Sequence, residues 1–187
     1  MSEPNDTPAE WHGGTVWLTG LPSAGKTTIA TVLADRLRAE GHRVQVLDGD
    51  EVRAALSTEL GYSKEDRDTN VRRIGYVAGL LAEHGVTVLV PAIAPYAMSR
   101  AAVRELHAAR GVRYVEVHVA TPVEICADRD VKSLYARQAA GELSGLTGAD
   151  DPYEAPVDPD LRIDTQHRTV DESVQQVRGL LTERGLS

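Results

Sequence analysis

Gly20-Leu21-Pro22-Ser23-Ala24-Gly25-Lys26-Thr27 is the stretch of this sequence that decides the fold. It matches G-x-x-x-x-G-K-[ST], the phosphate-binding loop or P-loop. Its glycines let the backbone curl until successive N–H groups point at phosphate oxygens. The lysine adds a positive charge for the β- and γ-phosphates, and the Thr27 hydroxyl can bind Mg²⁺. The stretch therefore predicts a nucleotide site.

The sequence on either side supplies the context that this loop needs. Residues 15–19 have the composition of a short strand. Residues 28–40 are predicted to be a helix because apolar side chains recur at helical spacing, at Ile29, Val32, Leu33 and Leu37. A strand, a glycine-rich turn and a helix N-terminus together form an anion site. The alternative, a glycine-rich turn that binds nothing, is disfavoured by this context.

Composition limits the kinds of partner. The chain has 187 residues, of which 42% are hydrophobic and 26% charged, as in a soluble globular protein. Its net charge of −8 argues against nucleic acid as a partner. The single Cys126 cannot form an intramolecular disulfide, which fits a reducing compartment, so we expect a cytoplasmic protein. No apolar run approaches the roughly 20 residues of a membrane span, so no membrane partner is expected.

The chain is predicted to form a single domain over residues 13–187, after a disordered tail at residues 1–12. No repeat, low-complexity tract or linker divides it. Residues 130–159 are unusually rich in Gly and Pro, at Gly141, Gly145, Gly148, Pro152, Pro156 and Pro159. A long irregular segment inside a compact domain is often a lid, and this one brings Arg129, Lys132 and Arg137.

Strand and helix patterns alternate along the whole chain. Further strands are predicted at 43–47, 86–90, 114–119 and 161–164, and further helices at 51–56, after Ser63, at 97–110, from 122 to about 130, and at 170–184. The alternation predicts an α/β fold of the P-loop NTPase kinase type, a three-layer α/β/α sandwich with a parallel sheet of about five strands. The order of the strands cannot be deduced from the spacing.

Two polar residues mark the predicted strand 114–119. Glu116 and His118 alternate with apolar residues, which predicts a less covered position for this strand. His118 is interpreted as structural rather than catalytic. On the preceding helix, Arg100 and Arg104 are expected to reach either the site or the surface.

Two carboxylates, Asp48 and Asp50, follow the predicted strand at 43–47. In open parallel sheets, ligands bind at the carboxyl ends of the strands. There the carboxylates could hold Mg²⁺ through water, or accept a proton from a substrate hydroxyl. The alternative is a turn with an Asp helix cap. The neighbouring phosphate loop favours the first interpretation.

A cluster of positively charged and polar side chains is predicted around the helix that begins after Ser63. Arg67 and Asn70 are spaced i, i+3, and with Arg53 they could form a pocket for an anionic second substrate. The alternative is a solvated charged face, and the residues by themselves leave both open. Ile93-Ala94-Pro95 forms a rigid loop at the same edge of the predicted sheet.

Together these blocks resemble the adenylyl-sulfate kinase (APS kinase) family over nearly all of residues 14–181. The blocks stand in family order at residues 20–27, 48–53, 60–67, 70–73, 93–96, 129–135 and 147–156. The resemblance implies the P-loop kinase fold and transfer of the ATP γ-phosphoryl group to the 3′-hydroxyl of adenosine 5′-phosphosulfate. The product would be 3′-phosphoadenosine 5′-phosphosulfate (PAPS), formed in sulfate assimilation. A homodimer is also implied.

The resemblance implies roles for named residues. ATP would be bound by Gly20, Leu21, Pro22, Ser23, Ala24, Gly25, Lys26, Thr27, Thr28 and Arg129. The acceptor would be bound by Asp48, Asp50, Arg53, Tyr62, Arg67, Asn70, Ile93, Ala94, Lys132 and Leu146. Lys26 and Asp50 are the expected catalytic residues, and Thr27 is the expected Mg²⁺ ligand.

This chain departs from the family pattern at informative positions. Many members have Ser at the position of Ala94, a serine sometimes assigned as a phosphoryl carrier. Alanine has no hydroxyl, which leaves direct in-line transfer. Phe is common at the positions of Tyr62 and Leu146, where two rings enclose the acceptor adenine; leucine offers only an apolar face. In the lid, Ser133 replaces a usual Gly.

Two other functions are weighed against this one. The first is a kinase of the same fold with a different small hydroxyl acceptor, which the altered adenine sandwich motivates. The second is a non-catalytic nucleotide-binding switch or partner subunit. A guanine-reading switch would carry Asn-Lys-x-Asp late in the chain, where Thr165-Gln166-His167-Arg168 stands instead.

Overall fold

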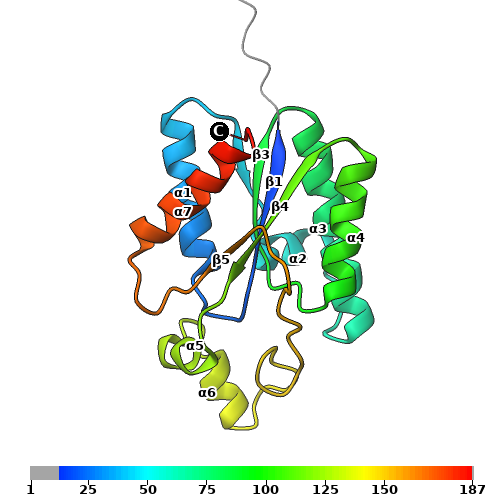
Figure 1. Cartoon of the computed structure of the whole chain (residues 1–187). Helices are drawn as coiled ribbons and strands as arrows, with labels where there is room; N and C mark the ends of the chain where they lie inside the picture. The colour runs from blue at the N-terminus through cyan, green and yellow to red at the C-terminus, as the bar shows by residue number, and fades with distance from the viewer. Residues whose placement is uncertain (1–12, 187) are drawn as a thin grey trace, which may run out of the picture.

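Five parallel strands form the centre of the molecule (Figure 1). The computed structural model describes residues 13–186, so the tail predicted at residues 1–12 lies outside the described residues. The strands are β1 (Gly14–Thr19), β2 (Val44–Val46), β3 (Thr87–Pro91), β4 (Arg113–Val119) and β5 (Leu161–Ile163). Their spatial order is β2-β3-β1-β4-β5, and every neighbouring pair is parallel.

Helices cover both faces of this sheet (Figure 1). One face carries α1 (Lys26–Ala39) and α7 (Val170–Glu183), and the other carries α3 (Lys64–Glu83) and α4 (Ala97–Ala109). The short α2 (Gly49–Leu56) follows β2, while α5 (Val123–Arg129) and α6 (Leu134–Ala139) lie beyond the carboxyl end of the sheet. This arrangement confirms the predicted three-layer α/β/α sandwich.

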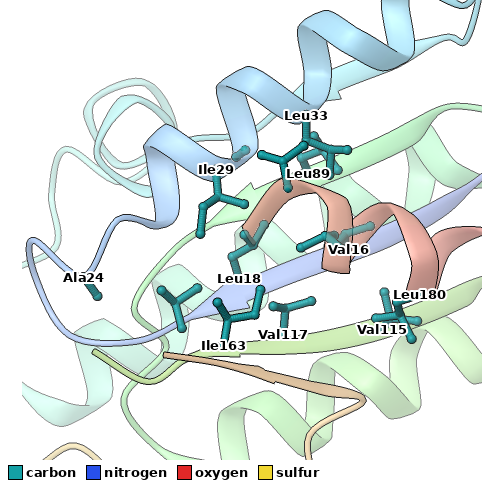
Figure 2. Close-up of a cluster of buried hydrophobic side chains, with 14 of the residues drawn as sticks. Val16, Leu18, Ala24, Ile29, Leu33, Leu89, Val115, Val117, Ile163 and Leu180 are labelled. Atoms are coloured by element: carbon teal, nitrogen blue, oxygen red, sulfur yellow. The ribbon is translucent and has the colours of Figure 1, made fainter. Parts of the chain in front are cut away.

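Side chains of β1 alternate between two apolar cores. Val16 and Leu18 pack under α1 and α7 with residues such as Ile29 and Leu180 (Figure 2). Trp17 points the opposite way, into the core under α3 and α4. Because successive strand residues point to opposite faces, a strand covered on both faces reads as an almost continuous apolar run. The central strand is therefore anchored on both sides, directly before the phosphate loop.

The strand order explains where a ligand can bind. From β1 the chain crosses to β2 and returns through β3, whereas β4 and β5 lie on the other side of β1. A parallel sheet opens a crevice at its carboxyl edge where the order reverses. The phosphate loop after β1 lies at this point, next to the segments that follow β2 and β3.

The expectation of a less covered position for β4 is wrong. This strand lies between β1 and β5, and Glu116 and His118 are only 7% and 8% exposed. The alternation of polar and apolar residues predicted exposure, but the charge of Glu116 is balanced inside the protein by Arg100, whose Nε lies 3.3 Å from Glu116 Oε1. His118 is buried beside the ring of Tyr153, and burial lowers its pKa to about 4. Such a histidine is neutral near pH 7.

Helix α6 adds regular structure to the segment at residues 130–159, which is otherwise loop. None of the helices between residues 13 and 186 is both long enough and apolar enough to cross a bilayer.

Candidate active site

Two glycines with positive φ shape the phosphate loop. Gly20 has a φ of 152°, and a Cβ placed on it would lie 2.4 Å from the carbonyl oxygen of Val119. No side chain fits at that position. Gly25 has a φ of 104° and immediately precedes α1. The two fixed glycines of the motif are thus explained by backbone geometry, which turns the chain from β1 into the helix N-terminus.

Lys26 is held over this loop. Its Nζ donates to the carbonyl oxygens of Gly20 at 3.0 Å and Leu21 at 2.7 Å. Burial lowers the pKa of Lys26 to about 8, an effect that the nearby acidic side chains of Asp50 and Asp48 partly oppose. Burial has removed water from the Lys26 ammonium, so the negative charge of a bound polyphosphate would stabilise its charged form.

Asp48 serves both as helix cap and as part of the site. Its carboxylate accepts the Asp50 N–H at 3.0 Å, which caps α2, and accepts the Thr27 hydroxyl at 2.9 Å. Both interpretations of this stretch are therefore compatible. The hydroxyl and carboxylate oxygens of Thr27 and Asp48 are donors suited to Mg²⁺, which usually takes one or two protein ligands plus water and phosphate.

Asp50 is paired with the segment predicted to be a lid, residues 130–159. Lys132, between α5 and α6, forms an ion pair with its carboxylate, and this hydrogen bond raises the pKa of Lys132. The pair joins the segment after β2 to the segment after α5 across the cavity. A substrate hydroxyl that binds at Asp50 must share or displace this contact.

Arg53 and Arg67 both donate hydrogen bonds to backbone carbonyls. Arg53 donates to the backbone carbonyls of Leu60 and Gly61, with its guanidinium 4.4 Å from the centre of the Tyr62 ring. Arg67 donates to the carbonyl oxygens of Tyr62 at 2.8 Å and Gly145 at 2.5 Å, and to the Thr147 hydroxyl at 2.7 Å. Both line the cavity, but Arg67 is also a tether between α3 and the lid.

Asn70 presents an unpaired acceptor. It is 9% exposed and lines the cavity, and its Oδ1 has no hydrogen-bond partner among the described residues. A buried polar atom without a partner costs free energy unless a ligand or water satisfies it. Asn70 can therefore accept a hydrogen bond from a bound molecule.

Arg129 is held by hydrogen bonds to the loop after β5. Its guanidinium donates to Thr165 Oγ1 at 2.9 Å and to the Thr165 carbonyl at 3.1 Å. Thr165, Arg168 and Thr169, in the loop after β5, line the same cavity, and sequence reasoning missed them. The rule that ligands bind at the carboxyl ends of parallel strands could have found them, because this loop follows a predicted strand.

One cavity of about 800 Å³ brings most of these groups together. Sixteen of the predicted site residues line it: Pro22, Ser23, Gly25, Lys26, Thr27, Thr28, Asp48, Asp50, Arg53, Tyr62, Arg67, Asn70, Ile93, Ala94, Arg129 and Lys132. The volume lies in the upper part of the range for small-molecule sites, about 300–1,000 Å³.

Four predicted residues do not line this cavity: Gly20, Leu21, Ala24 and Leu146. Gly20 and Leu21 reach it indirectly, through the carbonyls that hold Lys26. Leu146 is 6% exposed and packs in the core under α1 and α7, so it does not face Tyr62 across the cavity in this conformation.

Comparisons with known proteins agree on one family. The family model described as adenylylsulphate kinase matches residues 12–164. An adenylyl-sulfate kinase of Microcystis aeruginosa is 53% identical over 174 residues, which cover 93% of this chain and 94% of that protein.

Solved structures give the same result. The APS kinase of Mycobacterium tuberculosis in complex with AMPPNP and APS superposes with a TM-score of 0.89 at 46% identity, covering 91% of this chain and 98% of that one. A hexameric APS kinase from Thiobacillus denitrificans has a TM-score of 0.71 at 37% identity, covering 96% of this chain and 31% of that longer one. The chain therefore belongs to the adenylyl-sulfate kinase family of ATP-dependent kinases.

Proposed function

We propose that this protein transfers the γ-phosphoryl group of ATP to the 3′-hydroxyl of adenosine 5′-phosphosulfate and so makes PAPS for sulfate assimilation. The observation that carries this proposal is that one cavity joins the phosphate loop to Asp50, Arg53, Arg67 and Asn70. A phosphate donor and an anionic hydroxyl acceptor can thus meet in one site. Likeness to a structure solved with AMPPNP and APS supports the choice of substrates.

In the proposed reaction, the protein positions the substrates and neutralises charge. The loop amides and Lys26 would hold the ATP phosphates, and the Thr27 hydroxyl and Asp48 carboxylate would hold Mg²⁺. Bound Mg²⁺ would supply positive charge against the transferring phosphoryl group. Asp50 would orient or deprotonate the acceptor hydroxyl after Lys132 has released it.

The acceptor would lie along the wall formed by α3 and the loop after β3. Arg53 and Arg67 would pair with its phosphosulfate, Asn70 would accept a hydrogen bond, and Ile93 and Ala94 would contact it. Tyr62, which is exposed beside Arg53, would stack on its adenine. Leu146 would complete that enclosure only when the lid moves it from the core.

A homodimer in the cytoplasm is the proposed setting. The hexameric relative from Thiobacillus denitrificans supports self-association within this family. The single cysteine, Cys126, is buried as a free thiol, in keeping with a reducing compartment.

The deciding experiment is an ADP-release assay with ATP, Mg²⁺ and a panel of hydroxyl acceptors. Adenylyl sulfate should give the highest kcat/KM, and AMP and sugar alcohols should give little turnover. Faster turnover of another acceptor would replace the proposed substrate with that molecule. No turnover with any acceptor, together with tight ATP binding, would favour the non-catalytic nucleotide-binding partner.

The alanine at position 94 leads to a prediction about whether the phosphoryl group is transferred directly or through a covalent intermediate. Because alanine carries no nucleophile, we expect one in-line displacement at phosphorus. Incubation with γ-labelled ATP should leave no stable label on the protein, and a single turnover with chiral γ-phosphate should invert the configuration. Retention would imply two displacements and a carrier residue elsewhere in the site.

A further inference from the structure

Four consecutive carbonyls of the loop Ala92–Pro95 are each held by a donor from another part of the chain. The Trp17 indole donates to Ala92 at 3.1 Å, and the Thr19 hydroxyl donates to Ile93 at 2.5 Å. Arg100 donates to the Ala94 carbonyl at 2.8 Å, and the Glu154 N–H donates to the Pro95 carbonyl at 2.9 Å. We call these four residues the acceptor loop.

The conformation of this loop requires such support. Ala94 has a φ of 45°, in the left-handed region that a residue with a Cβ rarely adopts. Such a residue persists only when its surroundings fix it. In a planar trans peptide the C=O and N–H point in opposite directions, so fixing a carbonyl also fixes the N–H of the next residue. The N–H groups of Ile93 and Ala94 have no partner in the described part of the chain, and both residues line the cavity.

Arg100 joins the acceptor loop to the end of the lid. It is 4% exposed, and its two terminal nitrogens donate to different carbonyls, that of Ala94 and, at 2.7 Å, that of Glu154. Its Nε lies 3.3 Å from Glu116 on β4, which balances the buried charge. A planar guanidinium can make these three contacts at once, whereas a lysine ammonium on a flexible stem cannot reproduce the fork.

Thr19 makes a similar link from the end of β1. Its hydroxyl donates to the Ile93 carbonyl and lies 3.0 Å from the Tyr153 hydroxyl, so Tyr153 can donate to Thr19. Tyr153 and Glu154 belong to the same lid segment. Thr19 and Arg100 therefore fasten neighbouring points of the acceptor loop to neighbouring residues of the lid, and neither lines the cavity.

We propose that Thr19 and Arg100 are positioning residues that hold the acceptor loop in the shape that the second substrate requires. This inference rests on the proposed function, in which Ile93 and Ala94 contact the acceptor. It also explains how the loop can serve without a nucleophile at residue 94, because here the loop contributes a fixed backbone shape.

Thr19→Val and Thr19→Ser form a matched pair for testing this proposal. Valine keeps the shape but removes the donor, and serine keeps the donor. One lost hydrogen bond of about 1.4 kcal/mol corresponds to a factor of ten. Thr19→Val should raise the KM for adenylyl sulfate about tenfold and leave the KM for ATP within about twofold, whereas Thr19→Ser should stay near the parent protein. Equal KM values for valine and serine, or a parallel rise in the KM for ATP, would overturn the proposal.

Arg100→Lys tests the other contact while keeping a positive charge beside Glu116. It should raise the KM for adenylyl sulfate by about tenfold or more at an unchanged KM for ATP. An unchanged acceptor KM would refute the role of Arg100. Thermal unfolding of each variant would show whether it folds like the parent.

Amide hydrogen exchange supplies a readout that needs no acceptor. The Glu154 amide is bonded to Pro95 O, so it should exchange faster in Thr19→Val and Arg100→Lys, while amides between β1 and β3 keep their rates. If the parent protein fails to phosphorylate adenylyl sulfate, the proposed function falls, and this exchange still decides the positioning role. Unchanged exchange at Glu154 in both variants would then reject it.

Discussion

At the residue scale, Lys26 shows how burial changes the pKa of a side chain that is expected to bind phosphate. A solvent-exposed lysine has a pKa near 10.5, and burial brings that of Lys26 to about 8. The phosphates of ATP would stabilise the ammonium form, so the pKa of Lys26 should be higher in the ATP complex than in the free protein.

ATP affinity is therefore predicted to fall as the pH rises above 8. Below pH 8 the free protein already carries the proton, so the dissociation constant should change little. Above pH 8, ATP binding must restore that proton, and the dissociation constant should rise by up to about tenfold per pH unit. Calorimetric titration at pH 7 to 9.5, in buffers of different ionisation enthalpy, would measure both the affinity and the proton uptake.

Lys26→Arg is the control for this prediction, because arginine stays protonated throughout this range. Its ATP affinity should be weaker but independent of pH. A pH-independent affinity in the parent protein would show that Lys26 does not hold the phosphates in its ammonium form.

At the element scale, Arg67 couples α3 to the lid through Gly145 and Thr147. Its partners are 78 and 80 positions further along the chain, and its side chain is largely buried. An acceptor anion would compete with these contacts, so one guanidinium would serve both as an acceptor ligand and as a tether.

Arg67→Ala is predicted to raise the KM for adenylyl sulfate far more than the KM for ATP. The loss of one charge-assisted contact, about 1.5–3 kcal/mol, corresponds to roughly 10- to 150-fold. Initial-rate kinetics with each substrate varied in turn would measure the difference. Arg67→Lys keeps the positive charge but loses the planar guanidinium. Its KM for adenylyl sulfate should therefore lie between those of the parent protein and Arg67→Ala. Equal effects on both substrates would make Arg67 a purely structural tether.

Lys132 stands between two residues with positive φ, Asp130 at 20° and Ser133 at 52°. Both carry a Cβ, so this turn is strained, most clearly at Ser133, where the resemblance places a Gly. The ion pair of Lys132 with Asp50 crosses the cavity from this turn. A segment with such a strained turn is suited to movement when substrate takes over Asp50.

At the scale of the whole molecule, the segment Asp130–Pro159 spans the carboxyl edge of the sheet (Figure 1). It contacts residues that line the cavity through Lys132, through Gly145 and Thr147, and through Glu154. In the proposed function, Leu146 would face Tyr62 only after leaving the core, and that would require this segment to rearrange.

Amide hydrogen exchange in residues 130–159 is predicted to slow when ADP and PAPS are added together. The two bound ligands together would order this segment by contacting it from both the ATP side and the acceptor side of the cavity. Strand amides of β1 and β3 provide the internal reference, since the central sheet should be unaffected. Equal protection of residues 130–159 in the empty enzyme would show that they are not a mobile lid.

Local patterns in the sequence determined most of the elements and the phosphate loop. Gly20 and Gly25 are required by backbone dihedrals within the loop itself. The helices and strands follow apolar spacings of a few residues, which tertiary contacts did not change. The α/β class was predictable because such alternation has few compact solutions. The carboxylates after β2 and the loop after β3 were predictable because parallel strands align their carboxyl ends.

Tertiary structure alone decided the order β2-β3-β1-β4-β5 and the partners of the buried charges. Glu116 looked like a mark of exposure because composition does not reveal that Arg100 would reach it from α4. Leu146 is expected from the resemblance to face Tyr62, and in this structure its side chain packs in the core. A spacing constrains neighbours along the chain, whereas the partner of a buried charge depends on which surfaces come together. For that reason Thr19 and Arg100 were not recognisable as supports of the acceptor loop until the fold placed them beside it.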